Sequence, residues 1–319
     1  MSYPIKLQPV FKEIVWGGER LKSDYGYESD LNNIAEAWVL TARNDGDNTV
    51  KNGEYANKSF TELIKNNPQF LGEKGEKYNE FPLLIKFIDA KSDLSIQVHP
   101  DDDYARVHEN SLGKTEAWYV LDCADDAELI YGFNKEITKE EFENSIKDNS
   151  FLNHVNKVKV KKGDIFFIEA GTLHAIGGGI LLAEVQQNCN TTYRVYDYGR
   201  LVDGKPRELH IEKALDVTNT LPPVRSAEAE GEEIVIGDAK VQKLCSCEFF
   251  TMTSLKLNGK YEYNCDNSSF LSVLILEGKG SITVENTAVS VKKGDSIFIP
   301  ANSGKVMLSG ELSALLSTL

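Results

Sequence analysis

The sequence lacks any run of eighteen apolar residues, which is about the length that a helix needs to cross a membrane. Its first residues, Met-Ser-Tyr-Pro-Ile-Lys, also lack the apolar core of a secretory signal peptide. We therefore expect a cytoplasmic protein that makes no membrane contacts.

Cysteine is scarce, and the five cysteines are odd in number and scattered along the chain, which argues against a disulfide framework. Positive charge is in deficit as well. The chain carries 35 Lys and Arg residues against 49 Asp and Glu residues, for a net charge of −14. Such a chain does not have nucleic acid as its default partner. If the substrate is anionic, the positive charge that binds it must be gathered locally in a cleft.

The chain does contain an internal repeat. The stretch Val160–His174, V-K-K-G-D-I-F-F-I-E-A-G-T-L-H, matches V-K-K-G-D-S-I-F-I-P-A-N-S-G-K, Val291–Lys305, position by position. Lys305 stands where the first copy has His174. The repeat therefore predicts two similar β-domains, of which only the first can use this histidine.

With 319 residues and 41% hydrophobic content, the chain is long enough for two domains with full cores. We place them at residues 1–225 and 226–319, with the acidic stretch 228–233 as a solvated linker at the start of the second. A Thr-x-x-Glu pattern and apolar residues at helical spacing predict a helical insertion at about 136–156 in the first domain.

A polar strand face is predicted at Leu94–Asp103, L-S-I-Q-V-H-P-D-D-D. Alternate residues of a strand point to one face, so Ser95, Gln97 and His99 project together. A hydroxyl, an amide and an imidazole on one face are typical of a metal or ligand site. The alternative is a strand that turns its polar face to solvent.

Two further segments complete this pattern. The strand predicted at Lys114–Leu121 places Glu116 and Trp118 on one face. The element G-(x5)-E-x-G-(x2)-H, Gly163–His174, ends in a histidine that, taken alone, is more often a hydrogen-bonded core residue than a ligand.

Together these segments resemble the cupins, which are double-stranded β-helix barrels related to jelly rolls. The motifs S-I-Q-V-H-P-D-D, G-K-T-E and G-T-L-H-A-I are similar to the type I mannose-6-phosphate isomerases. W-G-G, P-L-L-I-K and Y-R-V-Y-D-Y-G-R extend the resemblance from Pro9 to about Val217, the last in the form of the short bacillus-type members. The resemblance implies a mainly β fold with two cupin-like (double-stranded β-helix, or jelly-roll) domains and a helical insertion in the first.

The resemblance also implies an activity, the interconversion of mannose 6-phosphate and fructose 6-phosphate through an enediolate. It implies one Zn²⁺ per chain, or another divalent ion, bound by Gln97, His99, Glu116 and His174. This nitrogen and oxygen set suits zinc on chemical grounds too. An amide oxygen is a weak zinc ligand. The alternative is therefore that Gln97 hydrogen-bonds to a metal ligand and does not bind the metal itself.

Catalytic roles carry over from the family onto Arg194, as the catalytic arginine, and onto Lys114. In the motif of Lys114, Thr115 replaces the usual proline and Gly113 stands where some members have histidine. For the general base we prefer Glu184 to Lys114, because Glu184 and Arg194 are expected to share one strand face, and burial is expected to raise the pKa of Glu184.

Phosphate binding is assigned in the family to the positions of Lys86 and Ser95. Lys86 interrupts an apolar run at 82–90, where a buried ammonium group needs an anionic partner.

Two other functions stay open. One is a different metallo-cupin enzyme, such as a dioxygenase or another sugar-phosphate isomerase or epimerase; Lys86 and Lys114 favour the isomerase, because an oxygenase gains nothing from phosphate-directed lysines. The other is a non-catalytic sugar-binding cupin, against which the four ligands and Arg194 speak. We expect a monomer or a homodimer, and the sequence does not choose between them.

Overall fold

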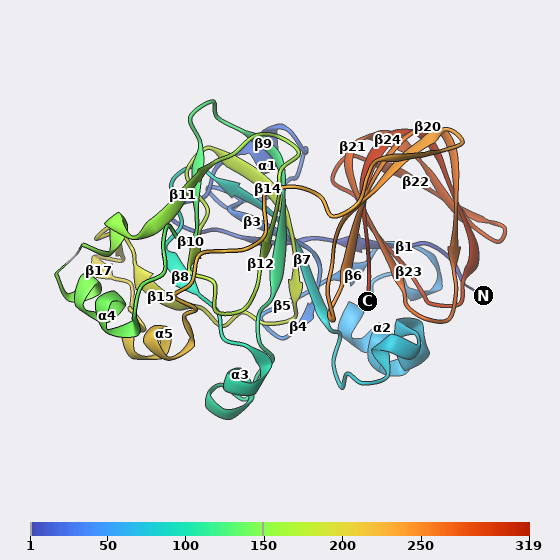
Figure 1. Cartoon of the computed structure of the whole chain (residues 1–319). Helices are drawn as coiled ribbons and strands as arrows, with labels where there is room; N and C mark the ends of the chain where they lie inside the picture. Colours follow the sequence, from blue (N-terminus) through green and yellow to red (C-terminus); the bar gives the residue numbers. More distant parts are fainter. Residues whose placement is uncertain (1, 149) are drawn as a thin grey trace.

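Strands β7 (Leu83–Ala90) and β14 (Ile180–Gln187) run side by side through the middle of the molecule, and every residue of both is buried (Figure 1). The computed structural model describes residues 2–148 and 150–319. Because layers cover both faces of β7, its sequence is a near-continuous apolar run rather than an alternating one. The two strands belong to what we call the central sheet, in the order β12 (Ile165–Ile168), β9 (Glu116–Cys123), β14, β7, β3 (Glu36–Leu40) and β2 (Val10–Lys12).

A second sheet, the outer sheet, covers one face of the central sheet. Side chains from both sheets form one cluster between them, among them Trp118 and Leu182 from the central sheet and Leu129 and Ile176 from the outer side. The strands of the outer sheet follow the order β11 (Val155–Lys159), β10 (Glu128–Phe133), β13 (His174–Ala175), β8 (Ile96–Val98) and β15 (Tyr193–Tyr196).

Helices are short and lie at the periphery. Helices α4 (Lys139–Lys147) and α5 (Ile211–Val217) pack on the far face of the outer sheet through Phe142 and Ala214 (Figure 1). The other helical segments are α1 (Arg20–Ser23), α2 (Phe60–Asn66), α3 (Asp102–His108), η1 (Gly53–Tyr55), η2 (Pro68–Leu71), η3 (Glu73–Gly75) and η4 (Phe151–Asn153). Among the described residues, none of the helices has the length and apolar character needed to span a bilayer.

The C-terminal half is built from long antiparallel strands that enclose an apolar core of their own. This C-terminal sheet follows the order β18 (Ile234–Ile236), β19 (Ala239–Ser246), β20 (Thr251–Cys265), β24 (Gly304–Thr318), β21 (Leu271–Val284), β23 (Ser296–Ile299), β1 (Ile5–Gln8) and β6 (Thr49–Val50), with β22 (Thr287–Lys292) paired to β21. Two small ribbons, β4 (Ala42–Arg43) with β5 (Gly46–Asp47) and β16 (Leu201–Val202) with β17 (Lys205–Pro206), complete the strands.

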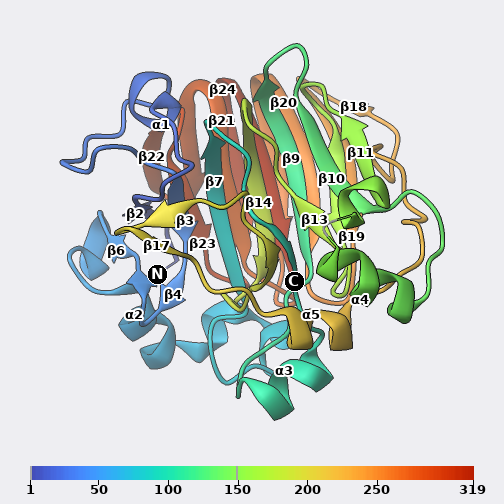
Figure 2. The same ribbon diagram turned by 90° about the vertical axis from the view of Figure 1, so that its left-hand side faces the viewer.

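The second face of the central sheet packs against the C-terminal half. In Figure 2 the strands β7, β14 and β9 lie in front of β21 and β24. The shared core includes Phe87 and Val185 from the central sheet and Phe270, Phe298 and Leu315 from the C-terminal half. The molecule is therefore layered, with α4 and α5, the outer sheet, the central sheet and the C-terminal sheet in succession.

The predicted repeat forms the same turn in both halves. Gly163 and Gly294 both have positive φ, at 95° and 86°. The carboxylates of Asp164 and Asp295 then accept hydrogen bonds from the N–H groups three residues earlier, at 2.9 and 2.8 Å. Glycine is needed here because positive φ is unfavourable for residues with a Cβ atom. The repeat predicted from the sequence is thus confirmed at this turn, and Lys305 of the second copy lies at the surface in an ion pair with Glu262.

The N-terminal strand belongs to the C-terminal sheet. Strand β1 pairs with β23, with Ile5 opposite Phe298 and Leu7 opposite Ser296, and β6 extends the sheet on the other side of β1. The predicted domain limits at residues 225 and 226 stay a prediction, and the first residues of the chain cross from one half to the other.

Local signals of the sequence act as predicted. Thr138 accepts a hydrogen bond from the Glu141 N–H at 3.0 Å, and the Glu141 carboxylate accepts one from the Thr138 N–H at 2.6 Å, which is a capping box. The box begins α4 inside the stretch predicted as a helical insertion. All five cysteines are free.

We expect Phe298→Ala to destabilise the protein by about 3–5 kcal/mol, the usual cost of deleting a buried phenyl group. Phe298 is fully buried and its ring lies 5.0 Å from that of Phe60 and 5.2 Å from that of Phe270, so it joins the two halves. The measurement is urea unfolding followed by tryptophan fluorescence. Val235→Ala is the control, because Val235 is 71% exposed and its truncation should leave the midpoint unchanged. Equal midpoints for wild type and Phe298→Ala would contradict the packing described.

Candidate metal centre and active site

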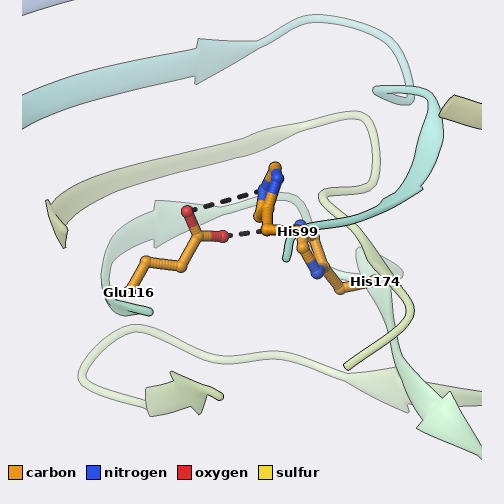
Figure 3. A group of neighbouring side chains, drawn as sticks. All are labelled: His99, Glu116 and His174. Atoms are coloured by element: carbon orange, nitrogen blue, oxygen red, sulfur yellow. Dashed lines mark ion pairs between the residues drawn. The ribbon is translucent and has the colours of Figure 1, made fainter. Parts of the chain in front are cut away.

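Three side chains of the predicted ligand set meet between the central and outer sheets. One potential ligand atom each from His99, Glu116 and His174 lies within 4.8 Å of the others, and all three residues are 1% exposed (Figure 3). Glu116 Oε1 lies 3.4 Å from His174 Nε2, and Glu116 Oε2 lies 3.9 Å from His99 Nε2. The part of the chain that the structure describes holds no second group of this kind among His, Cys, Asp and Glu residues.

Strand register brings these residues together. His174 on β13 lies directly opposite Gln97 on β8, and His99 follows two residues after Gln97 on the same side. The turn before His174 is fixed by Gly171, which has φ of 87° and donates its N–H to the His99 carbonyl at 2.8 Å. The second glycine of the G-(x5)-E-x-G-(x2)-H element thus links the two histidines through the backbone.

Both imidazoles are held in one tautomer. Nδ1 of His99 lies 2.8 Å from the Thr191 carbonyl, and Nδ1 of His174 lies 2.8 Å from the Thr172 carbonyl. A carbonyl only accepts, so each Nδ1 carries the hydrogen and each Nε2 presents a lone pair to the cluster. Burial lowers the pKa of His174 to about 3 and the pKa of His99 well below its usual range, so both rings are neutral, as metal ligation requires.

The carboxylate of the cluster is in an unusual state. Burial and the nearby Glu184 raise the pKa of Glu116 to about 7, although Lys114 opposes the shift. The Lys114 ammonium lies 2.8 Å from Glu116 Oε2 and 3.1 Å from His99 Nε2. Two neutral imidazoles and a buried carboxylate that favours a positive neighbour fit a divalent metal ion.

A hydrogen-bonded series leads from this cluster toward the surface. Gln97 Nε2 lies 3.4 Å from His174 Nε2, and Gln97 Oε1 accepts a hydrogen bond from the Ser95 hydroxyl at 3.2 Å. The Ser95 oxygen in turn accepts from Arg194 Nε at 3.3 Å. Gln97 therefore contacts the cluster while its amide oxygen is engaged by Ser95, and its role as a metal ligand stays a prediction.

Two family models match this chain. One, described as phosphomannose isomerase type I, catalytic domain, matches residues 5–130, and the other, mannose-6-phosphate isomerase, cupin domain, matches residues 240–319. The probable mannose-6-phosphate isomerase GmuF of Bacillus subtilis is 40% identical over 319 residues, covering 99% of each chain.

The chain belongs to the mannose-6-phosphate isomerase family. The family resemblance predicted from the motifs is confirmed. The mannose-6-phosphate isomerase of Streptococcus mutans is 37% identical over 322 residues, covering 99% of this chain and 98% of its own. The crystal structure of the mannose 6-phosphate isomerase from Bacillus subtilis superposes with a TM-score of 0.93 at 37% identity, covering both chains fully, which confirms the predicted mainly β cupin fold.

On the face of the central sheet that points toward the outer sheet, Lys86 lies in a buried group of charges. Its ammonium is 3.2 Å from Glu184 Oε1 and 3.5 Å from Glu36 Oε2, and Lys86 is 3% exposed. The indole N–H groups of Trp118 and Trp38 donate to Glu184 at 2.9 Å and to Glu36 at 2.6 Å. The anionic partner that the sequence required for Lys86 is thus a pair of protein carboxylates.

Two expectations about Glu184 are wrong. Burial alone would raise its pKa, but Lys86 and Lys114 outweigh burial and lower it. Glu184 and Arg194 also do not share a strand, because β14 ends at Gln187 and the chain then crosses from the central sheet to β15 of the outer sheet. The prediction failed because it applied the alternation of strand residues across the connection between β14 and β15, where the chain is not one continuous strand.

Sequence reasoning missed several residues at the site. Asp197 is 6% exposed and accepts hydrogen bonds from both Arg200 and Arg207, at 2.5 Å each, close to Arg194. Glu36 was missed although the alternation in A-E-A-W-V-L already placed it on the same face as Trp38. For Arg200 and Arg207, the only signal in the sequence was their closeness to Asp197 along the chain. Basic residues near an aspartate are common on protein surfaces.

We expect the affinity of the metal-stripped protein for a divalent ion to fall as the pH drops below about 7, by up to about tenfold per pH unit. Glu116, whose pKa is raised to about 7, must lose its proton before it binds metal. Calorimetric titration between about pH 6 and pH 8 measures this, and Glu116→Gln is the control with a flatter profile. An affinity that is constant with pH in the wild type would contradict the role of Glu116.

Proposed function

We propose that this protein interconverts mannose 6-phosphate and fructose 6-phosphate, with one divalent metal ion per chain and zinc as the first candidate. The observation that carries the proposal is the convergence of His99, Glu116 and His174, with Lys114 beside them, inside the barrel of this family. The relatives are named for mannose 6-phosphate isomerisation, which supports the same substrate here.

A bound metal ion would be held by His99, Glu116 and His174, with Gln97 as a proposed fourth ligand, and would supply a Lewis acid near the sugar oxygens. Zinc is preferred because its usual ligands in proteins are imidazole, carboxylate and thiolate, and the first two are present. Both histidines are already in the required tautomer, so little reorganisation accompanies binding.

We propose that Arg194 stabilises the oxyanion of the enediolate. Isomerisation moves a proton between C1 and C2, so negative charge develops on the oxygens of these carbons. The Arg194 guanidinium is held by Ser95 and by the Glu208 carbonyl, which accepts from Nη1 at 2.8 Å. A guanidinium keeps its charge at any physiological pH, which suits this role.

For proton transfer, the contacts favour Lys114 over Glu184. Lys114 Nζ lies at the ligand cluster, 3.1 Å from His99 Nε2. Glu184 is occupied at both oxygens, by the Trp118 N–H and by the Lys86 ammonium, and its lowered pKa makes it a weak base. We therefore propose Lys114 as the group that moves the proton and Glu184 as the residue that holds Lys86.

The phosphate is proposed to bind near Ser95 and the two arginines at Asp197, Arg200 and Arg207. Arg200 and Arg207 both pair with one carboxylate, Asp197, so this pair of guanidinium groups keeps positive charge for a dianion. Lys86 is left out of this proposal because its ammonium is inaccessible and contacts two carboxylates. Local positive charge of this kind resolves the conflict between an anionic substrate and a net charge of −14.

The test is a coupled measurement of fructose 6-phosphate formed from mannose 6-phosphate. We expect turnover by the purified protein, loss of turnover on chelation and recovery on adding zinc, with manganese, cobalt and magnesium compared in parallel. His174→Ala should lose metal and turnover together, because it removes one of the three ligands. His108→Ala is the control, since this residue is exposed and stacks only on Tyr104, at 4.0 Å.

Absence of turnover in the metal-replete protein would refute the proposed reaction. Turnover on a different sugar phosphate alone would indicate another isomerase or epimerase, and saturable sugar-phosphate binding without turnover would indicate a binding protein.

Arg194→Ala is expected to keep its metal and to lower kcat by about 100- to 1000-fold, the usual effect of removing one oxyanion donor. Metal content by atomic spectroscopy and steady-state kinetics are the two measurements. Loss of metal together with activity would mean that Arg194 supports the ligand cluster instead of the reacting sugar.

A further inference from the structure

The segment Glu208–His210 holds Arg194 at three points. The Glu208 carbonyl accepts from Arg194 Nη1 at 2.8 Å, the His210 N–H donates to the Arg194 carbonyl at 2.8 Å, and the Arg194 N–H donates to His210 Nδ1 at 3.3 Å. No other role described above uses His210.

The position of Arg194 in the sheet explains why a side chain makes one of these contacts. Strand β15 is the last strand of the outer sheet, and the N–H and carbonyl of Arg194 point away from β8 to the open edge, where they bond to His210. His210 supplies both missing partners, the donor from its backbone and the acceptor from its ring. It precedes α5 at the N-cap position, yet its side chain makes no capping bond to that helix.

We propose that His210, with the Glu208 carbonyl, is a clamp that fixes the backbone and the guanidinium of Arg194 in their working position. His210 is a positioning residue, since it acts on the substrate only through Arg194, and in this respect the inference rests on the proposed function. The clamp requires the neutral ring with its hydrogen on Nε2, because only then does Nδ1 accept.

The surroundings of His210 favour this state. Its Nε2 lies 3.9 Å from Glu208 Oε2, so the Nε2 hydrogen faces a carboxylate. Burial lowers the pKa of His210; Glu208 and Glu109 oppose that shift, and Arg194 and Lys213 add to it. The ring of Tyr193 lies 6.2 Å away. Protonation would turn Nδ1 into a donor facing the Arg194 N–H, so acid opens the clamp.

The experiment compares His210→Ala with His210→Asn, because the asparagine amide oxygen can occupy the place of Nδ1 and does not titrate. We expect His210→Ala to keep its metal and to lower kcat by roughly 10- to 100-fold, the scale of loss for a misplaced catalytic group. His210→Asn should restore most of kcat. The acid limb of its kcat profile should lie at lower pH than that of the wild type, with metal saturating throughout.

A double-mutant cycle tests the route of the effect. If His210 acts through Arg194, then His210→Ala should cost clearly less in an Arg194→Lys background than in the wild type. Hydrogen exchange gives a readout without activity: the peptide containing Arg194 should exchange faster in His210→Ala and at the wild-type rate in His210→Asn.

The outcomes separate the two proposals. A wild type without turnover refutes the proposed function, and hydrogen exchange still tests the clamp. An active wild type, an impaired Arg194→Ala and a fully active His210→Ala refute the clamp alone. Equal losses for His210→Ala and His210→Asn, or losses that add fully with Arg194→Lys, also refute it, as does unchanged exchange. If His210→Ala does not fold, the Asn variant and its pH profile decide.

Discussion

Packing of the central sheet on both faces is the constraint on which the site depends. One face of β7, β14 and β9 is apolar and closes against the C-terminal half, while the other face carries Lys86, Glu184 and Glu116 into the barrel. Because the strands are buried and paired on both sides, these charged groups cannot move toward water. Their electrostatic interactions are therefore strong, and each buried group must find its partner inside the protein.

The buried groups carry more negative than positive charge, and a bound cation would balance the difference. Glu36, Lys86 and Glu184 form one group, and Lys114 and Glu116 form the next, so three carboxylates face two ammonium groups. Burial, together with the nearby Glu184, raises the pKa of Glu116 to about 7, so that this carboxyl group can take up a proton when no metal is bound. A divalent ion would replace that proton and satisfy both histidine lone pairs. The affinity for a metal ion therefore depends on the balance of these buried charges.

Much of the site could be predicted from the sequence because its signals are local. The repeat and the polar face around Gln97 and His99 each depend on a few neighbouring residues, and the structure bears them out. The partners of Lys86, the separation of Glu184 from Arg194 and the contacts of His210 depend on which strands meet across the barrel. The periodicity of one strand does not show which strands pair with each other. At the edge strand β15, His210 provides the hydrogen-bond partners that a further strand would give to Arg194, and no sequence pattern predicts such a contact.

The pairing of β1 with β23 has a consequence for the order in which the chain becomes stable. Residues 5–8 and their partner strand, residues 296–299, are separated by most of the sequence. Until β1 pairs with β23, the C-terminal sheet lacks two strands, β1 and β6, at that edge, and contacts between sequence positions so far apart form slowly. A fragment that stops before β23 leaves β1 paired only with β6, with its other edge open. We therefore expect the pairing of β1 with β23 to be among the slower steps of folding.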